Sequence, residues 1–480
     1  MACCGNVNGR VHAASSASSA TPLDFMNGPP ERIMYVTCLQ PAEPEDRNGK
    51  SDYLATIDVD PESPTYCRVL NRLYMPEPGD ELHHFGWNAC VSCPDRENAH
   101  KYLIVPGFFS GNIHIIDVAS EPLNPKLIHF VKGSVIKGKY DASHPHTVHC
   151  IPSGDVMVHT LGDAEGNAVG KFYLLDGKTF EPKGLWNTGK EKIMGHDFWY
   201  QPRYNIMVSS ELGAPKKFTQ GFAATDMALG YYGSKLHFWN WRERKIEETV
   251  DLGLVYGALA MEIRFLHSPN APHGYVCTGV GSAIYHITRN EEQKWTANKV
   301  INVPHKVVTN WQLPFMPGLV TDQLISLDDK YLFFTCYLHG DVRQYDISNP
   351  AEPKLVSKFY VGGSTCPDTE VHVVKDEELE KQPERLVVRG RPIYGGPHMV
   401  QLSRDGKRLY VSTSIMTPWD KQFYSSLAKK GGVMIQLDVT AQGLKLNENF
   451  LVDFGEEPDG PCRGHEMRYP GGDCTSDIWL

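Results

Sequence analysis

A repeated strand pattern is the feature that most constrains the fold of this chain. A short run of alternating apolar residues that ends in an acidic or polar turn recurs along the sequence. The runs are YLATIDVD (53–60), NIHIIDVA (112–119), KFYLLDGK (171–178), KLHFWNWR (235–242), SAIYHITR (282–289), DVRQYDIS (341–348) and VMIQLDVT (433–440). Such alternation, bounded by Gly, Pro, Asp and Asn, predicts β-strands.

Each run also has strand-like neighbours. Another strand pattern precedes it, as in KYLIVPG at 101–107 and KYLFFTCY at 330–337, and a further one often follows, as in KLIHFV at 126–131. Units of three or four antiparallel strands therefore repeat about every 50–60 residues. Seven such units predict an all-β fold, a seven-bladed β-propeller, because radial repetition leaves only short sheet edges exposed.

The pattern predicts a single domain at 23–480, preceded by a short flexible N-terminal tail at 1–22. The tail lacks the basic start and apolar core of a secretory signal, which favours a cytoplasmic protein. Its Ser-rich composition leaves organelle targeting open. The stretch at 362–396 contains the charged run VVKDEELEKQPERL and is predicted to be an insertion before the last blade, with one helical turn.

Charge and hydropathy exclude several classes of protein. Lys and Arg total 47 against 57 Asp and Glu, a net charge of −10, which argues against nucleic acid as a partner. The chain is 41% hydrophobic and 22% charged, a globular composition. No apolar run approaches the ~20 residues that span a bilayer, so we expect no membrane span. The 12 cysteines, without a secretory signal, are expected to be reduced thiols.

One titratable residue per repeat stands shortly before the strand patterns. Four of them lie at the same distance ahead of their strand, two fit with longer loops, and one is placed by its motif near the end of the sequence. The seven are His84, His146, His196, Glu262, Asp322, His398 and His465. The innermost strands of a propeller line its central channel, so these positions are expected to form a ring.

Five imidazoles in one ring predict a metal site. Neutral imidazole is the commonest metal ligand, and clustered imidazoles suit copper, zinc, iron or nickel. Because polar residues also line water-filled channels without a ligand, a solvated ring is the alternative. Alternation places His83 and His84 on opposite sides, so which of them faces the channel stays open. His149 and His339 are expected to hydrogen-bond the ligand imidazoles and fix their tautomers.

The thiols offer a second kind of site. Cys90 and Cys93 form one CxxC in GWNACVSC, but a structural zinc site normally needs a second pair and none is evident. Packing, redox chemistry and soft-metal binding stay open for this pair. Cys3 and Cys4 are adjacent and could capture soft cations. Cys67, in SPTYCRV, is interpreted as a packed small residue at the start of an outer strand.

Several longer motifs resemble one known family. They are DYLATIDVDP (52–61), DELHHFGWN (80–88), DFWYQPR (197–203), EIRFLH (262–267), MPGLVTDQLISLDD (316–329), LHGDVRQYDIS (338–348), WDKQFY (419–424), and, near the end, FLVDFGEEPDGP and HEMRYPGGDCTSDIW. From about residue 20 to residue 480 the chain resembles the selenium-binding protein family, which includes the methanethiol oxidases.

The resemblance implies a seven-bladed propeller and a copper-dependent oxidase that converts methanethiol, O2 and water into formaldehyde, hydrogen sulfide and hydrogen peroxide. By motif, the implied copper ligands are His83 or His84, His146 and His465. Selenium binding is implied at Cys67. The chain departs from many members at two positions, where His196 replaces an aromatic residue and His398 replaces glutamine.

Two functional hypotheses follow. In the first, copper binds a small thiol substrate and reacts with O2, and Glu262 or Asp322 accepts the methyl proton. In the second, the protein is a non-catalytic selenium- or cadmium-binding protein in a redox or metal-stress response. It then acts through the thiols of Cys67, the CxxC pair or the N-terminal pair, with protein partners on the propeller face. A zinc or iron site that processes another small molecule is a third hypothesis.

Overall fold

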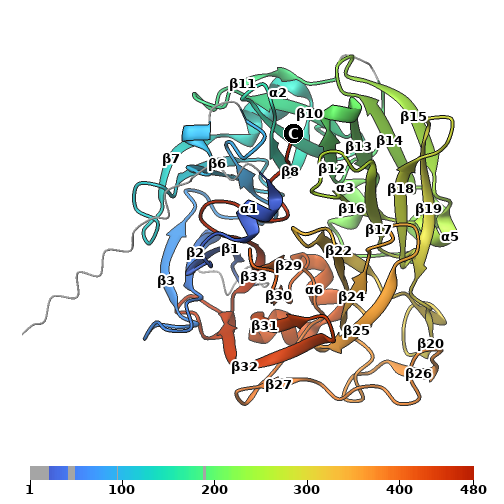
Figure 1. Cartoon of the computed structure of the whole chain (residues 1–480). Coiled ribbons are helices and arrows are strands. Elements are labelled where there is room, and N and C mark those ends of the chain that lie inside the picture. Colours follow the sequence, from blue (N-terminus) through green and yellow to red (C-terminus); the bar gives the residue numbers. More distant parts are fainter. Residues whose placement is uncertain (1–20, 42–48, 94–95, 188–190) are drawn as a thin grey trace, which may run out of the picture.

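The protein is mostly β, and its sheets lie side by side around the middle of the molecule (Figure 1). This computed structural model describes residues 21–41, 49–93, 96–187 and 191–480. Within these ranges seven sheets are four-stranded and antiparallel, which is consistent with a propeller-like fold. The predicted tail at 1–22 lies outside the described residues except for its last two positions, where Thr21 caps helix α1 (Pro22–Met26).

The seven sheets follow one another along the chain. In spatial order, the strands of the first are β3 (Val69–Tyr74), β2 (Tyr53–Asp58), β1 (Ile33–Leu39) and β33 (Arg463–Arg468). Those of the second are β4 (Gly86–Trp87), β5 (Tyr102–Pro106), β6 (Ile113–Asp117) and β7 (Lys126–Val131). Those of the third are β8 (Ser143–Cys150), β9 (Val156–Gly162), β10 (Lys171–Leu175) and β11 (Pro182–Leu185).

The remaining four-stranded sheets repeat this arrangement. The fourth is β12 (Phe198–Gln201), β13 (Ile206–Ser210), β14 (Lys235–Asn240) and β15 (Lys245–Asp251). The fifth is β16 (Ala260–Phe265), β17 (His273–Thr278), β18 (Ala283–Arg289) and β19 (Trp295–Asn302). The sixth is β22 (Val320–Ile325), β23 (Tyr331–Cys336), β24 (Asp341–Asp346) and β25 (Lys354–Tyr360). The seventh is β29 (Val400–Leu402), β30 (Arg408–Ser412), β31 (Val433–Thr440) and β32 (Gly443–Asp453).

Burial explains why these segments form strands. Every residue of β1 and of β2 is buried, as is every residue of β13, which fits strands covered on both faces by neighbouring sheets. The strands at the other end of each sheet are more exposed: β15 alternates between exposed and half-buried residues. The apolar alternation in the sequence therefore marks the inner and middle strands most clearly.

The core consists of side chains packed between adjacent sheets. One cluster joins the third, fourth and fifth sheets through aromatic residues. In it Trp239 of β14 lies edge-on to Phe172 of β10, with ring centroids 5.4 Å apart, and Trp186 packs beside both. Offset and edge-to-face ring contacts of this kind fix the spacing between neighbouring sheets.

The first and the last strand of the described chain pair in the first sheet. Strand β33 pairs antiparallel with β1, so that Tyr35 lies opposite Arg468 and Leu39 opposite Arg463. The sheet that contains the earliest strands is therefore completed by the last one, and β33 covers an edge of β1 that would otherwise be open.

The stretch at 362–396 differs from the prediction. No helix forms there; instead β26 (His372–Lys375) pairs with β20 (Lys306–Thr309), which also pairs with β21 (Phe315–Met316). The prediction of a helical turn was wrong, because this non-local pairing gives His372–Lys375 a strand conformation. The short hairpin of β27 (Val387–Val388) and β28 (Arg391–Pro392) follows.

The remaining helices are short and connect the strands. They are α2 (Gly133–Tyr140), α3 (Pro215–Phe218), α4 (Ala224–Ala228), α5 (Leu254–Gly257), α6 (Thr417–Phe423) and α7 (Ser425–Lys430), with 3-10 turns at Arg96–Asn98, Pro202–Tyr204 and Phe454–Glu456. No helix in the described part of the chain is long and apolar enough to cross a membrane.

Candidate metal and substrate site

A small cavity brings together side chains from all seven sheets or the segments that lead into them. Its volume is about 50 Å³. Its polar wall consists of His83, His84, His146, His196, Glu262, Thr321, His398 and His465, and its apolar wall of Phe108, Leu161, Leu212, Phe218, Met261, Leu319, Ile415, Met416 and Trp419. Six of the seven members of the predicted ring therefore line one space, and the seventh, Asp322, directly follows Thr321 in β22.

Irregular backbone places several of these side chains. The strand register shifts at Pro145/Val148 in β8, Ala260/Ile263 in β16, Val320/Gln323 in β22, and opposite Val36/Cys38 in β33. Each shift brackets a predicted ring residue. Bulges re-aim side chains and are common near functional sites. At the second shift the neighbours Met261 and Glu262 both line the cavity, which a regular alternating strand would not allow.

The orientation of His83 and His84 is also set by irregular backbone. Both residues line the cavity, because they lie in the extended segment between the bridge at Leu82 and the start of β4. Neither is part of a paired strand, so the alternation assumed for them does not apply. His196 and His398 likewise stand just before β12 and β29.

The imidazoles form a continuous group. The ring centroids of His84 and His146 are 4.1 Å apart, and those of His146 and His196 are 4.4 Å apart. On the other side, the ring of His465 lies 4.4 Å from that of His83 and 4.7 Å from that of His398. The ring nitrogens are spread along the wall and do not meet at one point.

Four of these imidazoles have lowered pKa values, which favour the neutral ring. Burial, with repulsion from neighbouring imidazoles, holds the pKa values of His146, His398 and His465 well below the usual range, and burial lowers the pKa of His196 to about 3. Nδ1 of His465 can only donate to the Ser414 carbonyl oxygen, 3.0 Å away, which leaves a lone pair on its Nε2.

Unpaired nitrogen atoms show that the wall has unused donor or acceptor capacity. His83 Nε2, His196 Nδ1, His398 Nδ1 and His465 Nε2 are buried and have no hydrogen-bond partner. An unpaired buried polar atom is costly, so four of them in one cavity point to a bound species that satisfies them. The donor set fits a transition metal that prefers imidazole.

Two buried carboxyl groups occupy different positions. Oε2 of Glu262 accepts a hydrogen bond from Arg264 at 2.9 Å, while its Oε1 is unpaired and lies 3.8 Å from Nδ1 of His196. Burial, together with repulsion from Asp197, raises the pKa of Glu262 well above its usual value. Both oxygens of Asp322 accept backbone N–H groups, and burial raises its pKa to about 7.

Sequence reasoning missed two carboxylates that contact the adjacent histidines. Glu81 lies 3.6 Å from Nε2 of His83 and accepts hydrogen bonds from both the backbone N–H and the hydroxyl of Thr417. Glu466 lies 3.4 Å from Nδ1 of His84 and accepts from Arg468 at 2.7 Å. Their signal was proximity in the sequence, since Glu81 precedes His83 by two residues in DELHH and Glu466 directly follows His465 in HEM.

The two residues expected to orient the imidazoles lie elsewhere. His149, on β8, packs its ring edge-on against Phe198 and Trp199, at 5.2 Å and 5.1 Å. His339 directs Nε2 to the Met316 carbonyl oxygen at 3.1 Å. Neither is part of the cavity wall.

Cys67 is also apart from the cavity. Cys67 is half-buried, its backbone is left-handed with φ 68°, and its Sγ lies 3.6 Å from the Asn449 carbonyl oxygen. Burial raises the pKa of its thiol. Cys3 and Cys4 lie outside the described residues.

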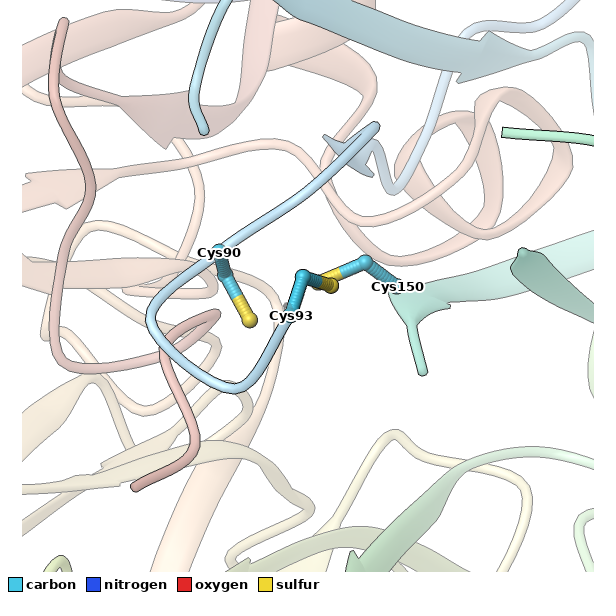
Figure 2. A group of neighbouring side chains, drawn as sticks. All are labelled: Cys90, Cys93 and Cys150. Carbon is cyan, nitrogen blue, oxygen red and sulfur yellow. The ribbon is translucent and has the colours of Figure 1, made fainter. Parts of the chain in front are cut away.

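The CxxC pair has a third partner that spacing did not predict. Cys150, at the end of β8, reaches the loop that carries Cys90 and Cys93 (Figure 2). One sulfur from each lies within 4.8 Å of the others, and all three residues are buried. Among the described residues this is the one group of three or more His, Cys, Asp or Glu with ligand atoms so close, and it could hold a metal ion.

The protein is mostly β and has a buried cavity lined by imidazoles, with a separate group of three thiols. The chain belongs to the 56 kDa selenium-binding protein family (SBP56), whose model matches residues 13–480.

Three relatives illustrate the family. The chain is 52% identical over 467 residues to "Selenium-binding protein 2" of Mus musculus, an alignment that covers 96% of this chain and 97% of the relative. It is 50% identical over 468 residues to "Methanethiol oxidase" of Homo sapiens, with 96% and 98% covered. A crystal structure of a hypothetical selenium-binding protein from Sulfolobus tokodaii is 34% identical, covers 97% of this chain and 99% of that chain, and superposes with a TM-score of 0.85.

Proposed function

We propose that this protein is a copper-dependent methanethiol oxidase, which converts methanethiol, O2 and water into formaldehyde, hydrogen sulfide and hydrogen peroxide. Relatives about half identical over nearly the whole chain are named methanethiol oxidase. The observation that carries the proposal is the group of buried imidazoles with unpaired nitrogens around a cavity of about 50 Å³. Because ~10–15 Å³ admits one water, this space suits a molecule with very few non-hydrogen atoms.

The fold that holds the cavity is proposed to be one closed seven-bladed propeller spanning residues 23–480. Seven successive four-stranded sheets support it, as does the pairing of β33 with β1, which joins the end of the repeat to its beginning. In this arrangement each sheet contributes its innermost strand, or the residues just ahead of it, to the central cavity.

Copper suits the histidine residues of the cavity by their donor chemistry, and binding would draw together nitrogens that are spread along the wall. His146, His465 and either His83 or His84 are the proposed ligands, with His196 and His398 as additional imidazoles within reach of side-chain rotation. When bound, copper supplies a soft Lewis acid for a thiolate and a one-electron partner for O2. The lowered pKa values of His146 and His465 favour binding, since a protonated ring cannot ligate a metal.

The apolar wall binds the methyl group of the substrate and excludes bulk water. Phe108, Phe218 and Trp419 present aromatic surface to the cavity, and Met261 adds a polarizable thioether. The Phe108 ring stacks on that of His83, with centroids 4.9 Å apart. A small, dry and mostly apolar cavity favours a small thiol over larger or charged ones.

Glu262 is the proposed proton acceptor for the methyl group, in preference to Asp322. It acts in its ionised form, and its raised pKa makes that carboxylate a stronger base. Its free Oε1 faces the cavity beside His84 and His196, at 3.9 Å and 3.8 Å. Asp322 has both oxygens occupied by backbone N–H groups, so its role is to hold β22 against β29. Arg264 bonds Oε2 of Glu262 and orients the carboxyl group.

Selenium binding at Cys67 is proposed as a second capacity of the protein. Among the ten described cysteines, nine are buried and Cys67 alone is half-exposed, which makes it the thiol most accessible to a selenite-derived species. It lies outside the cavity, so oxidase activity and selenium binding would occupy separate sites.

The oxidase proposal is tested by truncating the imidazoles. We expect His146→Gln and His465→Gln to lose most of the copper measured by mass spectrometry, and the release of sulfide and peroxide from methanethiol with it. The matched control is His339→Gln, also a buried histidine, which should keep both. Full copper and full turnover in both cavity variants would refute the assignment.

A further inference from the structure

Outside the imidazole cavity, the cluster of Cys90, Cys93 and Cys150 is the densest group of metal-ligating side chains in the described part of the chain. Two of its members come from one tight turn, in which the Cys93 backbone N–H donates to the Cys90 carbonyl oxygen at 3.1 Å. The third comes from a different strand. Figure 2 shows Cys93 and Cys150 with their side chains directed toward each other, and Cys90 on the facing side of the loop.

The surrounding side chains hold the two segments in place. The Ser92 hydroxyl lies 3.0 Å from Sγ of Cys90 and 2.9 Å from the Tyr200 hydroxyl. That tyrosine hydroxyl donates to the Cys150 carbonyl oxygen at 2.6 Å. Tyr200 therefore connects the loop to the end of β8, and it fixes the position of the third sulfur relative to the other two.

The environment is almost dry. Cys90 is 0% exposed, Cys93 2% and Cys150 3%, and Ala89 completes the cluster. Three thiols gathered in such a place gain little as hydrogen-bond partners, since sulfur is a weak donor and a weak acceptor. The same three sulfurs are strong ligands once deprotonated, and burial limits the access of O2 to an easily oxidised ion.

We propose that Cys90, Cys93 and Cys150 form a three-thiolate site for Cu(I). Thiolate sulfur selects Cu(I), zinc and iron–sulfur clusters over harder ions. A structural zinc site is almost always four-coordinate, and the described residues supply no fourth Cys, His, Asp or Glu to this group. Cu(I) accepts three sulfurs in a trigonal arrangement, and the thiol protons that it displaces leave to solvent.

This site is distinct from the imidazole cavity, although both use β8. Cys150 follows His146 by four residues on that strand, a separation of about 13 Å at ~3.3 Å per residue. The inference rests on the cysteine geometry and does not depend on the proposed oxidase activity.

The test is X-ray absorption at the copper edge, on full-length metal-free protein loaded with Cu(I) under anaerobic, reducing conditions. We expect a sulfur shell at about 2.3 Å, as for zinc–thiolate bonds. We also expect Cys150→Ala and Cys93→Ala each to lack that sulfur shell and to bind up to one copper ion per chain less than the wild type. The matched control is Cys277→Ala, which removes an equally buried thiol from another sheet and should leave the sulfur shell unchanged.

The outcomes separate this site from the cavity. In His146→Gln the sulfur shell should persist, whatever happens to turnover. Copper bound by nitrogen alone in the wild type would overturn the proposal. So would a sulfur shell that survives in both Cys150→Ala and Cys93→Ala, provided that near-ultraviolet circular dichroism shows both variants to be folded.

Discussion

Replacement of His339 by glutamine should remove one defined part of the acid sensitivity of the fold. His339 is 1% exposed, and its Nε2 bonds the Met316 carbonyl oxygen while Nδ1 has no partner. Burial, reinforced by repulsion from Lys306, lowers its pKa to about 3. A glutamine amide can donate to the same carbonyl oxygen and carries no titratable group.

The magnitude follows from the two protonation states. In the unfolded chain a histidine has a pKa of about 6.5, so below that pH the unfolded state binds a proton that the native state does not. The stability associated with neutral His339 is therefore complete above pH 6.5 and decreases by about 1.4 kcal/mol per pH unit as the pH falls toward 3. At pH 5 the loss is about 2 kcal/mol, and at pH 7.5 it is close to zero.

Urea unfolding of the metal-free protein at pH 7.5 and pH 5, followed by far-ultraviolet circular dichroism, measures this difference. Between pH 7.5 and pH 5, the free energy of unfolding should fall by about 2 kcal/mol more in the wild type than in His339→Gln. The control is His372→Gln, in which the replaced ring is exposed on β26, and it should follow the wild type. An identical pH dependence for wild type and His339→Gln would refute the reasoning that buried imidazoles in this protein stay neutral, on which their readiness to bind metal also depends.

Two further changes probe the proposed sites. Met261→Ala enlarges the cavity on its apolar side, so kcat/KM for ethanethiol relative to methanethiol should rise about 10-fold or more. Separate assays of each thiol that follow sulfide release measure the ratio, and an unchanged ratio would contradict the placement of the substrate. After incubation with selenite and glutathione, Cys67→Ser should retain less selenium than the wild type, as measured by mass spectrometry, while methanethiol turnover stays at the wild-type level. If the variant retains all of the selenium, another thiol binds it.

The sheets were predictable because the local pattern and the tertiary environment agree. The run NIHIIDVA corresponds to β6 and KLHFWNWR to β14, since alternating apolar residues with β-branched and aromatic side chains suit strands packed on both faces. The regular spacing of the repeat also placed His146, His196 and His398 at equivalent steps, and these three residues do line one cavity.

Features that depend on contacts between distant segments were not accessible from the sequence. The partnership of Cys150 with the CxxC pair arises from packing of β8 against the loop after β4, and no spacing rule encodes it. The register shifts that turn Met261 and Glu262 into the same cavity are backbone irregularities that alternation cannot anticipate. The strand β26 replaced an expected helical turn because β20 pairs with it from far away in the chain.

The pairing of β33 with β1 has a consequence for biosynthesis. A growing polypeptide emerges from the ribosome in order, so β1 is made early and must wait for almost the whole chain before β33 covers its edge. During that interval β1, which is apolar and wholly buried in the finished protein, is an open template for pairing with other nascent chains. Because His465 also arrives with β33, the set of imidazoles around the cavity is complete only after that strand has been translated, and a chaperone that shields β1 until then would raise the yield of folded protein.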